Sequence, residues 1–241
     1  MPQDPTRYQL IVAASPEEMA RRCAETIAAR LDLALGERDR AQIALAGGET
    51  PRATYHRLGG ERLPWERVDV LLGDERWVPA DDPASNARMI RETLLQGESG
   101  RHARFHPVPT QLADPEEGAR AYGELIEQLC SGSPPRLDVV LLGLGDDGHT
   151  ASLFPGTAAC GVVDRWVTVG AGKGLPRITA TAPLLSAARQ VLFLVSGAGK
   201  REALQRLLDP AASAAETPAK LVAPAQEVVI VADAAAAAGL G

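Results

Sequence analysis

Short apolar segments alternate with helical segments along the whole length of this chain. Most of the apolar segments are rich in valine, leucine or isoleucine, and they span 8–14, 42–46, 68–72, 105–108, 137–142, 166–169, 178–181, 190–195 and 228–232. Helices are expected between them, at about 16–35, from 51, at 86–95, at 115–129 and from 200. This alternation predicts an α/β fold with a mainly parallel sheet flanked by helices. Neither a long linker nor a repeat interrupts it, so we expect residues 1–241 to form a single domain.

The first helix has the clearest start signal in the chain. Ser15 and Glu18 have the spacing of a capping box, and Pro16 stands at the first helical position. The helix is therefore expected to begin directly after Ser15.

The composition limits the classes of function that the chain can have. With 45% apolar and 23% charged residues, a chain of 241 residues is ordinary for a globular protein with a sizeable core. A net charge of −6 argues against general nucleic-acid binding but permits a local basic pocket for an anion. No apolar run approaches about 20 residues, and the start lacks the features of a signal peptide. Three scattered cysteines without a CxxC pair indicate reduced thiols. We therefore expect a cytoplasmic protein without a membrane span, a disulfide or a zinc site.

The stretch from 137 to 156 carries the strongest functional signal. Its apolar run, 137–142, has Asp138 as the only polar residue and fits a strand buried on both faces of a parallel sheet. Glycines, two carboxylates and an imidazole then follow in the order Gly143, Gly145, Asp146, Asp147, Gly148 and His149. Open α/β sheets bind ligands at the carboxyl ends of their strands. An imidazole beside two carboxylates at that position indicates a proton-transfer site.

Two other interpretations of this loop are open. Residues 143–148 match the letters of the dinucleotide-binding pattern GxGxxG, although Asp146 and Asp147 would then face a pyrophosphate of like charge. The loop is alternatively a purely structural turn, with His149 as a hydrogen-bonded residue at the start of a helix.

The loop at 47–51, with the sequence GGETP, follows the second predicted strand. Thr50 can cap the next helix, with Pro51 at its first position, so the loop presents free backbone N–H groups at a helix start. Unpaired donors and the helix dipole attract phosphate to such a position. An ordinary tight turn between strand and helix is the alternative.

Two further strand ends carry unusual charges. Asp74, Glu75 and Arg76 follow the strand at 68–72, where charges must be paired, solvated or functional. Lys200 lies in the first turn of a helix, where the dipole disfavours a cation unless an anion also binds there. A self-contained ion-pair cluster and a plain exposed lysine are the alternatives. A turn at 170–174 carries Lys173, and Arg177 follows it.

The carboxyl ends of parallel strands lie along one side of the sheet. The four loops at 47–51, 73–76, 143–149 and 196–200 are therefore expected to form one cleft.

These motifs together resemble the 6-phosphogluconolactonase family. The matching stretches are GGETP at 47–51, GDER at 73–76 and above all GLGDDGHTASLFP at 143–155, with Pro83 to Asn86, Lys173 with Arg177, and 197–200 in addition. The resemblance runs over nearly the full length. It implies the modified Rossmann-like α/β fold shared with glucosamine-6-phosphate deaminase and ribose-5-phosphate isomerase. The implied reaction is hydrolysis of 6-phospho-D-glucono-1,5-lactone to 6-phosphogluconate in the oxidative pentose phosphate pathway, by a monomer or homodimer.

The resemblance also implies roles for individual residues. His149 would activate water as a base and then protonate the leaving ring oxygen, which an imidazole can do at cellular pH. Asp147 would orient or support His149, and Arg76 would bind substrate or stabilise the developing negative charge. The remaining expected substrate and phosphate contacts are Gly47, Gly48, Thr50, Asp74, Lys173, Arg177 and Lys200. Neither a metal nor a cofactor is implied, because a lactone is a far easier acyl group than an amide.

The chain departs from the family pattern at two places. The family often has serine before the two glycines of the first loop, where this chain has Ala46, so one hydroxyl contact to phosphate is absent. A common Lys-Pro-Pro-x-Arg run is here KGLPR at 173–177, which loosens the loop and keeps both cations.

Two rival functions remain to be weighed. A deaminase of the same fold carries a glutamate five residues after its histidine, where this chain has Phe154, although Asp74 matches the deaminase base. A non-catalytic sugar-phosphate sensor is the other rival. Such modules are normally joined to a DNA-binding segment, and this chain has no basic helix-turn-helix candidate. Product release distinguishes a sensor from an enzyme.

Overall fold

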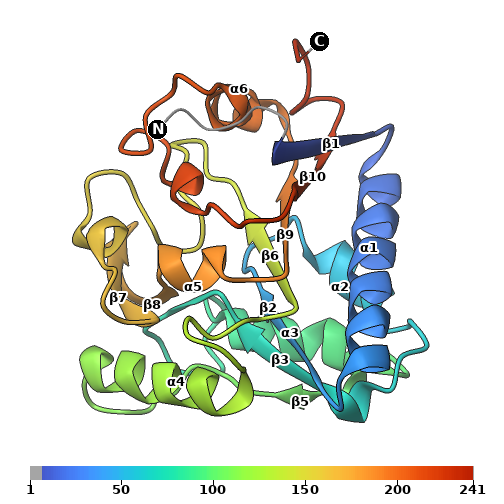
Figure 1. Ribbon diagram of the computed structural model, residues 1–241, viewed down its shortest axis with the longest axis vertical. Coiled ribbons are helices and arrows are strands. Elements are labelled where there is room, and N and C mark those ends of the chain that lie inside the picture. The colour runs from blue at the N-terminus through green and yellow to red at the C-terminus, as the bar shows by residue number, and fades with distance from the viewer. Residues whose placement is uncertain (1–6, 241) are drawn as a thin grey trace.

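A seven-stranded parallel sheet forms the centre of the protein (Figure 1). The structure is a computed structural model and describes residues 7–240. In spatial order the strands are β1 (Tyr8–Ala13), β10 (Val228–Asp233), β9 (Gln190–Val195), β6 (Val139–Gly143), β2 (Ala41–Leu45), β3 (Val68–Leu72) and β5 (Arg104–Phe105). Every neighbouring pair is parallel. The predicted mainly parallel sheet is therefore confirmed.

The inner strands are buried along almost their whole length. All residues of β2, β3, β9 and β10 are buried, and in β6 only the terminal Gly143 is half-buried. Layers on both faces of a parallel sheet favour such continuous apolar runs. The edge strand β1 differs, because its residues Gln9 and Val12 are exposed. One contiguous core joins the sheet to its covering elements.

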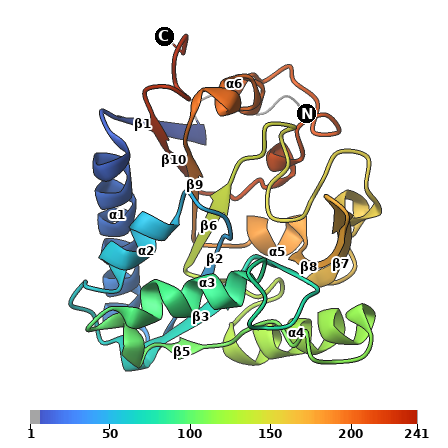
Figure 2. The ribbon, with the colours of Figure 1, turned by 180° about the vertical axis from the view of Figure 1, so that it is seen from behind.

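Within residues 7–240, six α-helices lie around the sheet. Their bounds are α1 (Pro16–Glu37), α2 (Arg52–Leu58), α3 (Asn86–Glu92), α4 (Pro115–Leu129), α5 (Ala182–Ser186) and α6 (Arg201–Leu208). The predicted start of α1 is confirmed, since the Ser15 hydroxyl accepts a hydrogen bond from the Glu18 N–H. Figures 1 and 2 place α1 and α2 together on one side of the sheet. Among residues 7–240, no helix combines the length and apolar character that a bilayer crossing requires.

A second, antiparallel sheet lies on the side away from α1 (Figure 2). It contains β4 (Asp74–Arg76), β8 (Leu175–Ala180) and β7 (Val167–Gly172), in that order. The charged segment at 74–76 is thus a strand, and its prediction as a loop is wrong. Three consecutive charged residues lack the alternation of apolar and polar residues that indicates a strand. Their pairing with β8 is a long-range contact, which the local sequence does not show. Gly73 links the two sheets, because its N–H donates to the Leu45 carbonyl and its own carbonyl accepts from the Ala180 N–H.

The predicted turn at 170–174 is shorter than expected. Strand β7 continues to Gly172, and only Lys173 and Gly174 connect it to β8. Both have positive φ, 53° and 80°, which is the geometry of a tight two-residue hairpin. The hairpin holds Lys173 at its tip.

The chain reverses its direction of strand addition between β2 and β6. From β2 it adds β3 and β5 towards one edge, and from β6 it adds β9 and β10 towards the other. Ligands of open α/β sheets bind outside the carboxyl ends of the strands at such a switch point. The loops after β2 and β6 both contain glycines, and both begin there.

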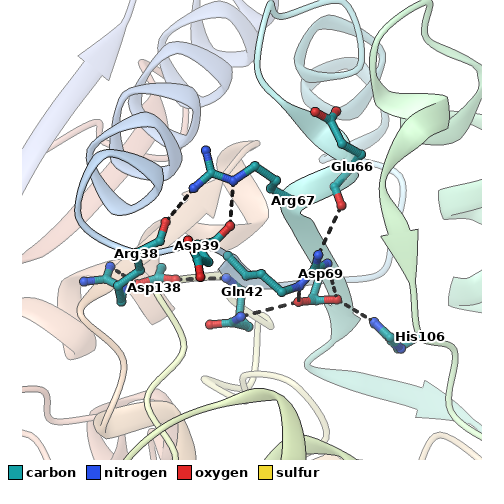
Figure 3. A network of polar contacts seen from close by, with 9 residues as sticks. Arg38, Asp39, Gln42, Glu66, Arg67, Asp69, His106 and Asp138 are labelled. Atoms are coloured by element: carbon teal, nitrogen blue, oxygen red, sulfur yellow. Dashed lines mark hydrogen bonds and ion pairs between the residues drawn. The ribbon is translucent and has the colours of Figure 1, made fainter.

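A network of ion pairs lies at the amino-terminal ends of the central strands (Figure 3). Asp69, near the start of β3, is fully buried and accepts hydrogen bonds from Arg40 at 2.7 and 2.8 Å. His106 Nε2 lies 2.9 Å from the same carboxylate. Asp138, which precedes β6, binds Arg38 Nη2 at 2.6 Å and accepts from the Gln42 N–H at 2.9 Å. The polar residue of the central apolar run is therefore structural.

Replacing Asp69 by asparagine is expected to lower the free energy of unfolding at pH 7 by about 2 kcal/mol. Burial alone would raise the pKa of Asp69, but hydrogen bonds from His106 and Arg40 and the charge of Arg40 hold it well below its usual range. The stabilisation is therefore present at neutral pH and is lost as the pH falls below about 4 towards the folded-state pKa. Urea unfolding at pH 7 and pH 3 should show a smaller difference between wild type and variant at pH 3. A difference that does not change with pH would contradict this assignment.

Candidate active site

The four glycine-rich and charged strand ends meet at one cavity of about 220 Å³. Nine of the ten residues predicted for the site line it, namely Gly47, Gly48, Thr50, Asp74, Arg76, His149, Lys173, Arg177 and Lys200. Asp147 lies behind this lining, in contact with His149. The prediction that the loops at 47–51, 73–76, 143–149 and 196–200 share one cleft is confirmed.

His149 is paired with Asp147 two residues earlier in the same loop. Its ring atom Nδ1 lies 2.5 Å from Asp147 Oδ1, and its backbone N–H donates to the same oxygen at 3.0 Å. A carboxylate can only accept, so Nδ1 carries the proton and Nε2 keeps its lone pair. Within residues 7–240 no group hydrogen-bonds to Nε2. The ring thus presents a basic nitrogen that is free to act on a ligand in the cavity.

The surroundings keep His149 neutral and Asp147 charged near neutral pH. Burial lowers the pKa of His149, Lys173 lowers it further, and the hydrogen bond and charge of Asp147 offset this only in part. Burial would raise the pKa of Asp147, but hydrogen bonds from the backbone and ring of His149 bring it below its ordinary value. A neutral imidazole supported by a carboxylate is the form that a general base requires.

Two residues without polar chemistry fix the position of this pair. A Cβ atom on Gly145 would lie 2.0 Å from His149 Nδ1 and 2.5 Å from Asp147 Oδ1, so only glycine fits there. The Phe154 ring lies against the imidazole with a centroid distance of 4.3 Å. Phe154 is itself buried, and Gly172 leaves room for it, since a Cβ there would be 2.2 Å from the ring.

The C-terminal part of the chain braces the loop that carries His149. Arg206, on α6, donates from Nη2 to the Asp146 carbonyl at 3.1 Å and from Nε to Thr217 Oγ1 at 3.2 Å. The Ala219 N–H donates to the Gly148 carbonyl at 3.0 Å. Sequence reasoning missed this support, because Arg206 and Thr217 belong to no motif.

Four cations line the cavity in different settings. Arg177 on β8 is buried, donates from Nε to the Gly172 carbonyl at 3.1 Å, and lies over the Phe154 ring. Arg76 donates from Nη1 to the Ala84 carbonyl. Lys173 and Lys200 are more accessible, and Lys200 Nζ lies 3.9 Å from Asp146 Oδ1. Four positive charges therefore line the cavity despite the net negative charge of the chain.

The two carboxylates of β4 have different functions. Glu75 accepts from the N–H groups of Asn86 at 2.7 Å and Ala87 at 2.8 Å, so it caps the start of α3. Burial raises the pKa of Glu75 even though these hydrogen bonds lower it. Asp74 instead lines the cavity, and its Oδ2 accepts from the Ser152 hydroxyl at 2.6 Å. Among the described contacts neither carboxylate pairs with the Arg76 guanidinium, so the expected alternative of a local ion-pair cluster is wrong.

The loop after β2 differs from its prediction in one respect. Helix α2 begins at Arg52 after Pro51, and no side chain among residues 7–240 caps it, so the expected Thr50 cap is wrong. The Glu49 carbonyl accepts from the Arg52 N–H instead, at 3.2 Å. Gly48 has a φ of 99°, a conformation that favours glycine. Since the Thr50 hydroxyl does not cap the helix, it remains available to a ligand.

Sequence reasoning did not assign Asn86 to the site, although the structure places it in the cavity wall. Its side chain occupies the space beside Gly47, where a Cβ atom would lie 1.9 Å from Asn86 Oδ1. The only sequence signal was its position in the segment that follows the Asp-Glu-Arg motif.

Known proteins match this chain over most of its length. The family model described as glucosamine-6-phosphate isomerases/6-phosphogluconolactonase matches residues 14–231. The 6-phosphogluconolactonase of Synechocystis sp. is 44% identical over 224 residues, which cover 92% of this chain and 93% of that protein. The corresponding protein of Nostoc sp. is 42% identical over 222 residues, covering 91% and 92%.

Solved structures agree with this result. A 6-phosphogluconolactonase from Trypanosoma brucei superposes with a TM-score of 0.87 at 31% identity, over 98% of this chain and all (100%) of the other. A monomeric glucosamine-6-phosphate deaminase has a TM-score of 0.80 at 23% identity, covering 95% and 98%, and shares the fold. The expected fold class is thereby confirmed.

Proposed function

The chain belongs to the glucosamine-6-phosphate isomerase/6-phosphogluconolactonase family, and on that premise we propose that His149 is the general base with which it hydrolyses 6-phospho-D-glucono-1,5-lactone. Its similarity to 6-phosphogluconolactonases identifies it as a lactone hydrolase of the pentose phosphate pathway. One observation supports the role of His149 most strongly. Within the described part of the chain its Nε2 has no hydrogen-bond partner, while Asp147 holds the proton on Nδ1.

The proposed reaction begins with a water molecule at His149 Nε2. The imidazole takes one proton of the water as its oxygen attacks the lactone carbonyl, and Asp147 stabilises the imidazolium that forms. Arg76 stabilises the negative charge that develops on the carbonyl oxygen. The C1–O5 bond then breaks, and His149 returns the proton to the ring oxygen, which becomes the 5-hydroxyl of 6-phosphogluconate. His149 is then neutral again and ready for the next catalytic cycle.

The phosphate of the substrate is proposed to bind at the loop after β2. The backbone N–H groups of residues 48–50 donate to no group within residues 7–240, and Arg177 and Lys200 line the same cavity. Lys173, at the hairpin tip, is a further candidate cation. Oxygens of a phosphate suit both backbone donors and guanidinium groups.

The Phe154 ring argues against the deaminase reaction for this chain. It packs on the imidazole of His149 and cannot exchange a proton, as a glutamate at that position would. Asp74, the counterpart of the deaminase base, accepts a hydrogen bond from Ser152 and lies 3.7 Å from Arg177 Nη1.

Two assays separate the lactonase from the deaminase function: acid release from 6-phosphogluconolactone and ammonia release from glucosamine 6-phosphate. We expect only the first, and ammonia release alone would overturn the proposal. Binding of either compound without turnover would indicate a sensor.

The acid limb of the pH profile of kcat/KM is expected to have a midpoint below 6.5, the ordinary pKa of histidine. A base works in its deprotonated form, so a lowered pKa keeps the enzyme active at lower pH. The Lys173→Met variant removes a positive charge that lowers the pKa of His149, and its midpoint should move to higher pH. Initial rates between pH 5 and 8, corrected for spontaneous opening, provide the measurement. A profile without an acid limb, or one unmoved in the variant, would contradict this account.

Replacing Arg177 by methionine is expected to raise KM by roughly 10- to 100-fold, the size of a lost charge-assisted hydrogen bond. Methionine keeps the apolar contact with Phe154 and removes the charge. Steady-state kinetics with the phosphorylated lactone measure the effect, and unphosphorylated glucono-1,5-lactone is the control substrate. An equal loss with both lactones would assign Arg177 to a function other than phosphate binding.

A further inference from the structure

Asn86 is the most buried polar side chain in the cavity wall, with a relative exposure of 1%. It lies at the start of α3, between the loop after β2 and strand β4. We propose that Asn86 Oδ1 accepts a hydrogen bond from a hydroxyl group of the substrate's sugar ring, which makes Asn86 a residue that determines specificity. The inference rests on the proposed function, because it names a contact within that same site.

Hydrogen bonds to β4 fix the orientation of the Asn86 side chain. The Nδ2 group donates to the backbone carbonyl of Asp74 at 2.8 Å and approaches its carboxylate at 3.4 Å. A carbonyl oxygen can only accept, so the nitrogen of the amide must face Asp74. The Asn86 N–H is held by Glu75 at 2.7 Å. The amide plane therefore has one orientation, with Oδ1 on the side away from Asp74.

Gly47 provides the space into which this oxygen projects. A Cβ atom on Gly47 would lie 1.9 Å from Oδ1 and 2.3 Å from the side-chain carbonyl carbon. Oδ1 makes no hydrogen bond with any other group in residues 7–240, and it is absent from the enclosed polar atoms that lack partners there. It is thus an open acceptor at the cavity, next to the glycine of the proposed phosphate loop.

An open acceptor in this cavity suits a polyhydroxylated ligand. Four of the other eight polar side chains of the wall are cations, which donate hydrogen bonds and suit the phosphate and carbonyl oxygens. Ring hydroxyls must donate to an oxygen or a nitrogen, and one oxygen of the Asp74 carboxylate already accepts from Ser152. A site that hydrogen-bonds a hydroxyl rejects an analogue without it, because its buried polar group is left unpaired.

The test combines Asn86 variants with substrates that lack single hydroxyls. Wild-type protein is assayed with 6-phosphogluconolactone and with its 2-deoxy, 3-deoxy and 4-deoxy analogues. We expect one analogue to lose roughly 10- to 100-fold in kcat/KM. Leucine has nearly the same shape as asparagine. With the parent lactone, kcat/KM of Asn86→Leu should fall by a similar factor, and with the affected analogue kcat/KM of this variant should fall no further. A purely structural role would lower the rates for the parent and all three analogues by the same factor.

Two further variants test the position of the Asn86 oxygen. Gly47→Ala retains Asn86 but displaces its Oδ1, so it should also fail to distinguish parent from analogue, even if Asn86→Leu does not fold. Arg88→Met is the matched control, because Arg88 lies on the same helix, pairs with Glu92 at 2.7 Å and is not part of the cavity wall. It should keep the wild-type ratio between parent and analogue. Full discrimination in Asn86→Leu or Gly47→Ala overturns the inference and leaves the lactonase proposal intact. Wild-type protein that opens no lactone refutes the proposed function, and the inference with it.

Discussion

Replacing His149 by alanine is expected to reduce kcat for lactone opening by about 10² to 10⁴, the usual contribution of a positioned general base. The imidazole is the only group in the described cavity wall with an unpaired basic nitrogen beside an orienting carboxylate. The backbone donors and cations are unchanged in the variant, so binding of 6-phosphogluconate should change only a few-fold. Single-turnover rates and a binding titration measure the two quantities.

His56→Ala is the matched control for this variant. His56 is exposed in the last turn of α2 and lies outside the cavity wall, so kcat should equal that of wild type. Asp147→Asn should fall between the two, because an amide permits the wrong tautomer of His149. Wild-type kcat in His149→Ala would show that another group activates the water.

Replacing Gly145 by alanine is expected to lower kcat by at least about 10², although no reacting group is removed. The new methyl group would occupy the space of His149 Nδ1 and Asp147 Oδ1, which lie 2.0 and 2.5 Å from the ideal Cβ position. The pair must therefore shift, and a misplacement of about 1 Å is enough for such a loss. Steady-state kinetics and thermal unfolding of the variant test this together.

Gly161→Ala is the comparison for the glycine variant. Gly161 ends a short 3₁₀ helix at Ala158–Gly161, and a Cβ atom there meets nothing within 4 Å. Its kcat should not change. Gly145→Ala with wild-type kcat and an unchanged unfolding temperature would show that the imidazole does not need its observed position.

The sheet could be predicted from the sequence because burial on both faces leaves a continuous apolar run. Strands β2, β3, β9 and β10 are of this kind, and each was placed to within one or two residues. The pairing of His149 with Asp147 was also visible, since two residues in one tight loop are close whatever the fold around them. The shared cleft followed from the rule that parallel strands end at one edge.

The antiparallel sheet was not predictable, because its order depends on contacts between distant segments. Strand β4 pairs through Glu75 with Ile178, yet nothing in the charged segment itself indicates a strand. The role of Asn86 depends on the absence of a side chain at Gly47, which belongs to another loop. The support that Arg206 gives to the catalytic loop is likewise a long-range contact.

The most direct test of the account is the initial rate of acid release from freshly generated 6-phospho-D-glucono-1,5-lactone, recorded at constant pH. Wild-type protein, His149→Ala and buffer alone are compared, since the lactone also opens without an enzyme. We predict a rate that rises in proportion to wild-type protein and lies far above buffer, with His149→Ala close to buffer. Acid release that wild-type protein does not raise above the buffer rate would contradict the central claim.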